Sequence, residues 1–297
     1  MFQYLLGVIL LYALARTYEE PVEALPDVII GPGGVLGFYT LGICHYLINH
    51  YELQDKHIAG FSAGSFNTFF MRLDPEKRTF FLRGIFSCHV HSSIELLKNV
   101  IKFIETNTVI EDYTLGKMSI AISHPEGCVL YDNFLNINNA MRCCNSSSFV
   151  PFVTNEAVLN FYHHKMSMDG YFLYGHFMKN YKSPPLVVSP DMFGRYANSI
   201  YHNILFILGF HELQATTIYQ LYLNGYHDAM NNHSYFEDYL KPIRPRNPPC
   251  EVRPEPQQPP APQTAPGSCT GSIPESSSSH IPPVVSRDKD CHNTVLG

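Results

Sequence analysis

The chain has 297 residues, of which 45% are hydrophobic and 15% are charged, and its net charge is -6. This length allows one large domain or two small ones, and the apolar content allows a sizeable core. The negative charge and the lack of a basic stretch in the sequence argue against nucleic acid as a partner, because phosphate binding needs clustered Lys and Arg. The eight cysteines include no C-x-x-C pair, which indicates free thiols rather than a disulfide or zinc framework.

The N-terminal residues 2–15 form an almost wholly apolar run. This run is shorter than the roughly 20 residues that a membrane-spanning helix needs. Three interpretations stay open: a short membrane anchor, a cleaved signal peptide that ends at Ala13–Ala15, or a packed helix. Residues 16–26 are polar and typical of a linker, so we separate an N-terminal segment, 1–26, from the domain that follows.

A glycine-rich loop follows the first predicted strand. The β-branched run Val28–Ile30 predicts a buried parallel strand, and Phe38–His50 has apolar residues at helical spacing. The loop between them, Gly31–Gly37, is suited to anions, because glycines turn successive N–H groups toward a ligand. It lacks a complete G-x-G-x-x-G pattern in either register, which disfavours a dinucleotide. An oxyanion formed during acyl transfer is the other candidate anion.

The second glycine-rich turn, Gly60–Gly64, has the pattern G-x-S-x-G. Such a turn between a strand and a helix is typical of a nucleophile elbow, with Ser62 exposed at the end of the strand. The flanking stretches fit, because Ile58–Phe61 predicts a buried strand end and Ala63–Met71 predicts a helix. Both turns follow predicted neighbouring strands, so we expect them to meet at one edge of the sheet.

A general base for Ser62 is less clear from the residues alone. Five histidines after the elbow are candidates, none within a recognisable motif: His163, His164, His176, His202 and His211. The pair His89 and His91 has strand-like spacing for metal ligands but no partner motif, so we predict no metal and no cofactor. Asp169, followed by Gly170 after a short apolar segment, is the stronger candidate.

Taken in order, Gly33–Gly37, Gly60–Gly64 and Asp169–Gly170 resemble the motifs of the patatin-like phospholipase family. In detail the likeness is greatest to its animal triglyceride-lipase and adiponutrin-like branch, and it covers residues 27–232. Further stretches that resemble the family are Tyr51–Leu53 with Ile58–Gly60, Ala140–Cys144 with Phe149–Pro151, Leu186–Pro190 and Leu223–Ala229.

The resemblance implies a serine lipid acyl hydrolase, of the phospholipase A2 or triacylglycerol lipase type, with a catalytic dyad. Ser62 would be the nucleophile and Asp169 its base, and the backbone N–H groups of Gly33, Gly34 and Val35 would form the oxyanion hole. Four further glycines would support the motifs: Gly37, Gly60, Gly64 and Gly170. The implied partner is a lipid substrate at a membrane or lipid-droplet surface. The protein would be membrane-associated, on the cytoplasmic face or a lipid droplet, with a secreted or luminal location as the alternative.

Three positions depart from the family pattern. Pro32 removes a backbone donor from the loop, Leu36 stands where many members have Arg or Lys, and Tyr171 stands where they have a small residue. These departures favour one alternative, a patatin-fold protein that binds lipid with weak or no catalysis. A second alternative is a Ser-His-Asp esterase that acts on soluble esters.

The predicted fold class is α/β, a patatin-like three-layer α/β/α sandwich with a central, mostly parallel sheet. The predicted strands are Val28–Ile30, Ile58–Phe61, Met118–Ile122, Met166–Asp169 and Leu186–Ser189. The predicted helices are Phe38–His50, Ala63–Met71, Ser93–Thr106 with a core-facing side, and Ala197–Tyr222, divided near Gly209. The catalytic domain would span residues 27–240, and the Pro- and Ser-rich tail 241–297 would be disordered.

Overall fold

The computed structural model describes residues 25–87, 92–197 and 215–243, all of which lie in one compact unit, Met1–Pro245. The apolar N-terminal run 2–15, almost all of the tail 241–297 and the pair His89 and His91 lie outside the described residues, so the three interpretations of the run stay open. Within the described ranges, no helix is long and apolar enough to cross a membrane.

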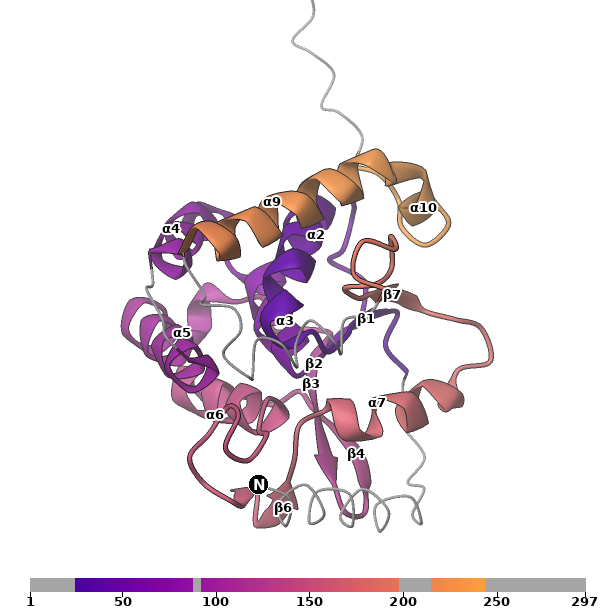
Figure 1. Ribbon diagram of the computed structural model, residues 1–297. Helices are drawn as coiled ribbons and strands as arrows, with labels where there is room; N and C mark the ends of the chain where they lie inside the picture. Colours follow the sequence, from indigo (N-terminus) through magenta and orange to yellow (C-terminus); the bar gives the residue numbers. More distant parts are fainter. Residues whose placement is uncertain (1–24, 88–91, 198–214, 244–297) are drawn as a thin grey trace, which may run out of the picture. The chain divides into compact units, whose positions relative to one another are not determined.

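A central sheet of five strands organises the fold, in the order β4-β3-β2-β1-β7 (Figure 1). Strand β1 pairs in parallel with β2 and β7, β2 pairs in parallel with β3, and β4 forms an antiparallel hairpin with β3. The strands are β1 Val28–Ile30, β2 Ile58–Phe61, β3 Met118–His124, β4 Gly127–Tyr131 and β7 Leu186–Val188. The predicted α/β class with a mostly parallel central sheet is therefore confirmed.

Helices cover both faces of this sheet (Figure 1). Ile30 packs with Tyr39 and Leu47, whereas its neighbour Ile29 packs with Phe177, because successive strand residues point to opposite faces. The first face carries α2 Gly37–His50 and α3 Ala63–Arg72, with α9 Ala215–Asn231 packed on α2, and the second face carries α7 Tyr171–Phe177. The carboxyl ends of β1 and β2 lead directly into the two glycine-rich turns.

The remaining elements lie around these layers. Three of the helices begin with a side chain that accepts a backbone N–H: Asp74 from Glu76, Ser92 from Glu95, and Asn136 from Asn139. The elements are α4 Pro75–Phe86, α5 Ser93–Asn107, α6 Ile137–Ser147, α10 His233–Glu237, and the short 3-10 turns η2 Gly34–Leu36, η3 Ile110–Asp112 and η4 Met178–Asn180.

The predicted strand Met166–Asp169 is wrong in its bounds and in its place. The strand here is β6, Lys165–Ser167, and it pairs with β5, Asn160–Tyr162, in a separate sheet of two strands. His163 and His164 both have positive φ, 49° and 65°, so the chain reverses tightly and pairs with its own preceding segment. The fifth central strand is instead β4, whose five residues are all half-buried.

The helix predictions near the N-terminal half are confirmed, with bounds that shift by one residue. The predicted core-facing helix is α5, but of its residues only Ile104 is fully buried, and the other apolar side chains are half-buried. Most of the predicted helix Ala197–Tyr222, with its division near Gly209, lies outside the described residues. Helix α9 continues past Tyr222 to Asn231.

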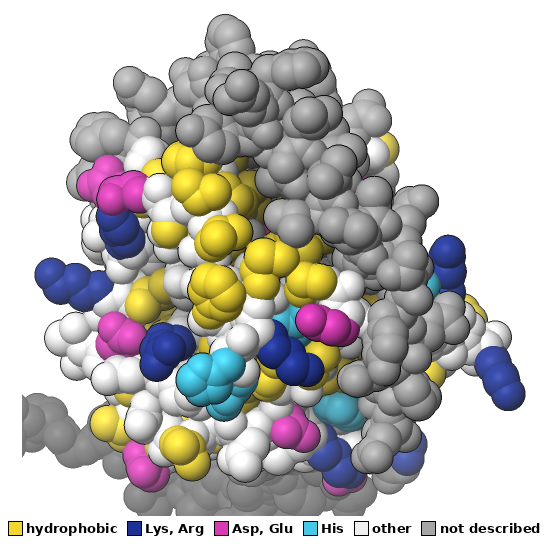
Figure 2. Space-filling view, turned by 90° about the horizontal axis from the view of Figure 1, so that it is seen from below, with side chains coloured by type: hydrophobic (Ala, Val, Ile, Leu, Met, Phe, Trp, Pro, Cys, Tyr) yellow, Lys and Arg dark blue, Asp and Glu magenta, His cyan; other side chains and the backbone are white. Residues whose placement is uncertain are grey.

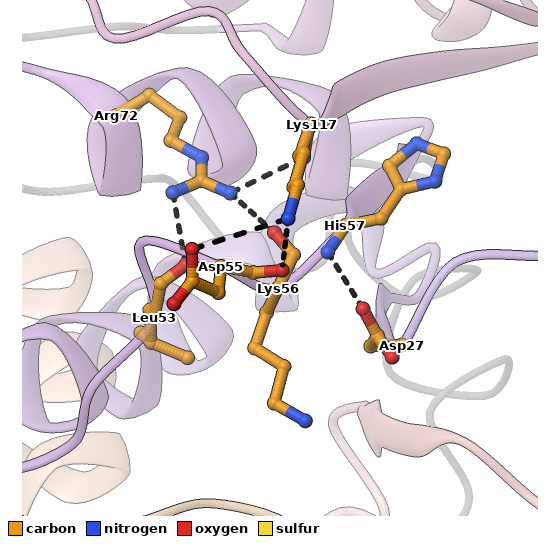
Figure 3. Close-up of polar contacts among 7 residues, drawn as sticks. All are labelled: Asp27, Leu53, Asp55, Lys56, His57, Arg72 and Lys117. Atoms are coloured by element: carbon orange, nitrogen blue, oxygen red, sulfur yellow. Dashed lines mark hydrogen bonds and ion pairs between the residues drawn. The ribbon is translucent and has the colours of Figure 1, made fainter.

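Arg72, the last residue of α3, ties together the loops at the amino ends of β2 and β3 (Figure 3). Its buried guanidinium donates hydrogen bonds to the carbonyl oxygens of Leu53 at 3.1 Å, Lys56 at 2.6 Å and Lys117 at 3.2 Å. Burial lowers the pKa of Arg72. This cluster lies at the edge of the sheet opposite the glycine-rich turns, so we assign it to stability.

A buried carboxylate fastens α9 to α2. Asp228 on α9 accepts two hydrogen bonds from Arg195, at 2.6 and 2.7 Å, and one from the Tyr39 hydroxyl at 2.8 Å. The hydrogen bonds with Arg195 hold the pKa of Asp228 below its usual value. The hydrogen-bond partners of Asp228 in the described residues are side chains of the protein itself, so we assign Asp228 to stability.

Candidate active site

The turn at Ser62 has the strained backbone of a nucleophile elbow. Ser62 lies between β2 and α3 with φ 54° and ψ -127°, a conformation that few non-glycine residues adopt. Gly64 is required by close packing, because a Cβ there would lie 2.2 Å from the carbonyl oxygen of Ile30. At Gly60 a Cβ would lie 2.5 Å from the carbonyl oxygen of Gly64. Both glycines of the G-x-S-x-G pattern therefore permit the turn.

The structure brings Ser62 and Asp169 together, although they are 107 residues apart. The Ser62 hydroxyl donates to Oδ2 of Asp169 at 2.7 Å. Both residues are buried, with 6% and 4% of their surface exposed. This distance is short enough for direct transfer of the hydroxyl proton to the carboxylate.

Backbone groups fix the Asp169 carboxylate and its turn. The N–H of Tyr171 donates to Oδ1 of Asp169 at 2.8 Å, which leaves Oδ2 for Ser62. The N–H of Asp169 donates to the carbonyl oxygen of Phe149 at 2.9 Å. The bulky Tyr171 therefore does not displace the Asp169 carboxylate from Ser62. The Tyr171 side chain lines the mouth of the cavity, and 49% of its surface is exposed.

Burial gives Asp169 an unusual protonation equilibrium. Desolvation raises the pKa of Asp169 to about 6, against the lowering effect of its hydrogen bonds from Ser62 and Tyr171. No Lys, Arg or His among the described residues forms an ion pair with it. A carboxylate with a raised pKa is a stronger base than an ordinary aspartate and is still ionised at neutral pH.

Ser147, at the end of α6, connects the two halves of the pair, and the sequence reasoning missed it. Its hydroxyl accepts from the N–H of Ser62 at 2.9 Å and donates to the carbonyl oxygen of Ala121 at 2.7 Å. Its own carbonyl oxygen accepts from the N–H of Gly170 at 2.8 Å. The available signal was the run of three serines, Ser146–Ser148, between the two stretches that resemble the family, Ala140–Cys144 and Phe149–Pro151.

The glycine loop lies beside Ser62, as predicted from the order of the strands. Gly33, Gly34 and Val35 line the same cavity as Ser62 and Asp169. Gly34 has φ 54°, a conformation that is strained for other residues. The loop is also braced from α3, since the Asn67 side chain donates to the carbonyl oxygen of Gly37 at 2.9 Å.

The three residues that depart from the family pattern, Pro32, Leu36 and Tyr171, lie in different surroundings. Pro32 lines the cavity with the glycines, whereas Leu36 is buried with 3% of its surface exposed. Leu36 packs inward, so a cation at this position would have no room in this arrangement. Tyr171 stands at the cavity mouth, as described above.

The cavity next to Ser62 has a volume of about 340 Å³ and mostly apolar walls. Helices α2, α3, α4 and α5 and the segment after α6 all contribute to it. The apolar side chains that line it are Phe38, Leu41, Phe66, Phe81, Ile85, Leu96, Leu97, Val100, Val150, Val153 and Phe172. A hydrocarbon chain fits such walls better than a polar substrate does.

No described histidine is among the residues that line this cavity. His163 and His164 form the β5–β6 turn, and His176 lies on α7. His202 and His211 lie outside the described residues. Likewise, the described part of the chain contains no group of three or more His, Cys, Asp or Glu side chains placed to hold a metal ion.

Comparison with known proteins adds nothing to this geometry: no protein-family model, no curated protein and no solved structure matches the chain.

Proposed function

We propose that the protein is a lipid acyl hydrolase of the patatin-like type, which cleaves carboxylic esters of phospholipids or acylglycerols. The observation that carries this proposal is the 2.7 Å hydrogen bond from Ser62 to Asp169 at the wall of a cavity with apolar sides. A strained serine, a buried carboxylate of raised pKa and a glycine loop in one place support covalent acyl transfer.

The proposed reaction begins when Asp169 takes the hydroxyl proton of Ser62 as the serine oxygen attacks the ester carbonyl. The loop of Gly33, Gly34 and Val35, together with the N-terminus of α3, would stabilise the negative oxygen of the tetrahedral intermediate. The intermediate collapses to an acyl-serine, and the leaving alcohol takes the proton from Asp169. Water then attacks the acyl-serine through the same base and releases the fatty acid.

The choice of an acyl ester follows from the walls of the cavity. Its apolar side chains favour the acyl chain, and Ser62 and Asp169 are among the few polar groups that line it. The proposed place of action is a membrane or lipid-droplet surface, where such esters are found. A Ser-His-Asp mechanism has less support, because the described cavity walls include no histidine.

The test is a hydrolysis panel with a soluble p-nitrophenyl ester, a phospholipid and a triacylglycerol, comparing wild type with Ser62→Ala. We expect wild type to release fatty acid from at least one lipid class and Ser62→Ala to release none above background. Folded wild-type protein that binds these lipids without hydrolysing any of them would favour the lipid-binding alternative. Equal rates for the two proteins would contradict the assignment of Ser62.

A further inference from the structure

The segment that joins α6 to β5 exposes an unusual number of apolar side chains. Phe152, Val158, Leu159 and Phe161 lie within ten residues, and between 45% and 57% of each is exposed. Proteins rarely expose several large apolar side chains close together on the surface, and such patches often mark a binding site. We call Phe152–Phe161 the apolar segment.

The apolar segment is continuous with the wall of the proposed active site. Val153 and Thr154, which belong to the segment, line the cavity beside Ser62. The hydroxyl of Ser93 at the start of α5 also bonds the carbonyl oxygen of Val153. One side of the segment therefore faces the cavity, and other residues of the same segment face outward.

The charge around the apolar segment is positive, although the whole protein is negative. The segment's one charged side chain, Glu156, is paired with Lys98 at 2.8 Å. Arg142, on α6 before the segment, and Lys165, after it, are exposed, and neither forms an ion pair with another described residue. Glu126, in the β3–β4 turn, offsets part of this charge.

An open hollow lies where the apolar segment meets these basic groups. It has a volume of about 520 Å³ and is lined by Asn139, Arg142, Phe161, Tyr162, His163 and His164. Figure 2, which views the fold from the side of β6 and α7, shows hydrophobic side chains gathered on this face, with Lys, Arg and His as well as Asp and Glu around them. An apolar surface with a basic hollow at its edge is complementary to a bilayer that contains anionic lipids, because such a bilayer has negative headgroups above a hydrocarbon interior.

We propose that the apolar segment and the basic hollow dock the protein on an anionic phospholipid bilayer, with Phe161 inserted among the acyl chains and Arg142 and Lys165 at the phosphate level. This proposal rests on the proposed function, because it describes how a lipid hydrolase would reach its substrate. Docking in this way places the cavity wall formed by Val153 and Thr154 against the lipid surface, so that an ester reaches Ser62 without crossing water.

The test is flotation of the full-length protein with vesicles of pure phosphatidylcholine and of an equimolar phosphatidylcholine–phosphatidylglycerol mixture. Phe161→Asp is compared with Met230→Asp, since Met230 is similarly exposed, at 48%, on α9 near the end of the fold opposite β6 (Figure 1). Both side chains project from the surface, so circular dichroism and the urea midpoint should match wild type. We expect Phe161→Asp to reduce binding to both kinds of vesicle at least ~10-fold and Met230→Asp to bind as wild type.

The charge arm compares Lys165→Gln with Lys241→Gln, another exposed lysine, near α10. We expect Lys165→Gln to weaken binding to the mixed vesicles about fivefold and to leave binding to pure phosphatidylcholine unchanged, while Lys241→Gln changes neither. Raising the salt concentration should reduce only the binding to the mixed vesicles.

Three results would overturn the proposal: no binding of wild type to either vesicle, equal binding by Phe161→Asp and wild type, or a wild-type dimer that Phe161→Asp converts to a monomer. The last result would assign the surface to a second copy of the chain. Hydrolysis is not scored in this assay. A protein that shows no esterase activity but still binds vesicles through Phe161 would therefore refute the proposed function and leave the docking surface intact.

Discussion

Two buried aspartates, Asp169 and Asp228, lie in opposite electrostatic surroundings. Each has less than a tenth of its surface exposed. Asp228 faces a guanidinium and a tyrosine hydroxyl, and its pKa is lowered by Arg195. Asp169 faces a serine hydroxyl and a backbone N–H, and burial raises its pKa to about 6.

The two carboxylates differ in their partners and in how strongly burial desolvates them. A guanidinium neutralises Asp228, so its charge is stabilised in the folded state and strengthens the contact between α2 and α9. Asp169 has no cation partner among the described residues, so its charge is held at a cost in free energy. Such a cost is typical of a group that is kept for chemistry rather than for stability.

The largest expected effect separates the two aspartates by activity. Asp169→Asn should reduce kcat/KM for a p-nitrophenyl ester by about 10⁴-fold, because the serine then has no base. Asp228→Asn should leave the activity of the folded protein unchanged, because Asp228 does not line the cavity. The measurement is ester hydrolysis per mole of folded protein. Wild-type turnover by Asp169→Asn would show that Asp169 is not the base that activates Ser62.

The next effect is in the pH dependence of stability. The pKa of Asp169 is about 6 in the folded protein and about 4 in the unfolded chain, so the folded state binds the proton more tightly. Stability contributed by this group is present below pH 4 and is lost as the pH rises to about 6, a fall of about 3 kcal/mol. Asp169→Asn should lack this fall, as seen in urea unfolding of both proteins from pH 4 to 8.

Asp228 should behave in the opposite sense. Its pKa is lowered in the folded protein, so its contribution to stability is present above the ordinary aspartate pKa and is lost as the pH falls through the folded value. At neutral pH, Asp228→Asn should lower the free energy of unfolding by about 2 kcal/mol, less than for a fully buried pair because the Arg195 guanidinium is half-exposed. An unchanged urea midpoint would show that the ion pair is not structural.

The smallest effect concerns the support of the dyad from α6. Ser147→Ala leaves the buried N–H of Ser62 without its acceptor, so we expect kcat to fall about tenfold with KM little changed and stability to fall by ~1–2 kcal/mol. Ser148→Ala is the matched control, since the buried Ser148 hydroxyl has no partner among the described residues. Its activity and stability should stay close to wild type, and equal losses in both variants would contradict a positioning role for Ser147.

The half of the site that contains Ser62 could be predicted from the sequence. The strands Val28–Ile30 and Ile58–Phe61 are short runs of apolar residues, and each leads into a glycine-rich turn, so periodicity and spacing identify both. The two strands are parallel neighbours, so the loops that leave their carboxyl ends meet at one edge of the sheet.

Asp169 was a candidate from its Asp-Gly turn, but its role as the base of Ser62 depended on a resemblance, because its support comes from distant parts of the chain. Ser147 is 85 residues from Ser62, and a serine at the end of a helix has no periodic pattern that reports its partner. The segment before Asp169 also alternates like a strand of the main sheet, yet it pairs with β5 across a turn of two histidines. Pairing within a hairpin and pairing within the central sheet give the same local pattern.

The central claim, that Asp169 activates Ser62, is tested most directly by mass spectrometry of the protein after reaction with a fluorophosphonate probe. We predict an adduct on Ser62 of wild type whose rate of formation rises with pH through about 6, the same adduct on Asp228→Asn, and almost none on Asp169→Asn. Failure of folded wild type to form the adduct, or labelling of Ser62 in Asp169→Asn at the wild-type rate, would contradict the claim.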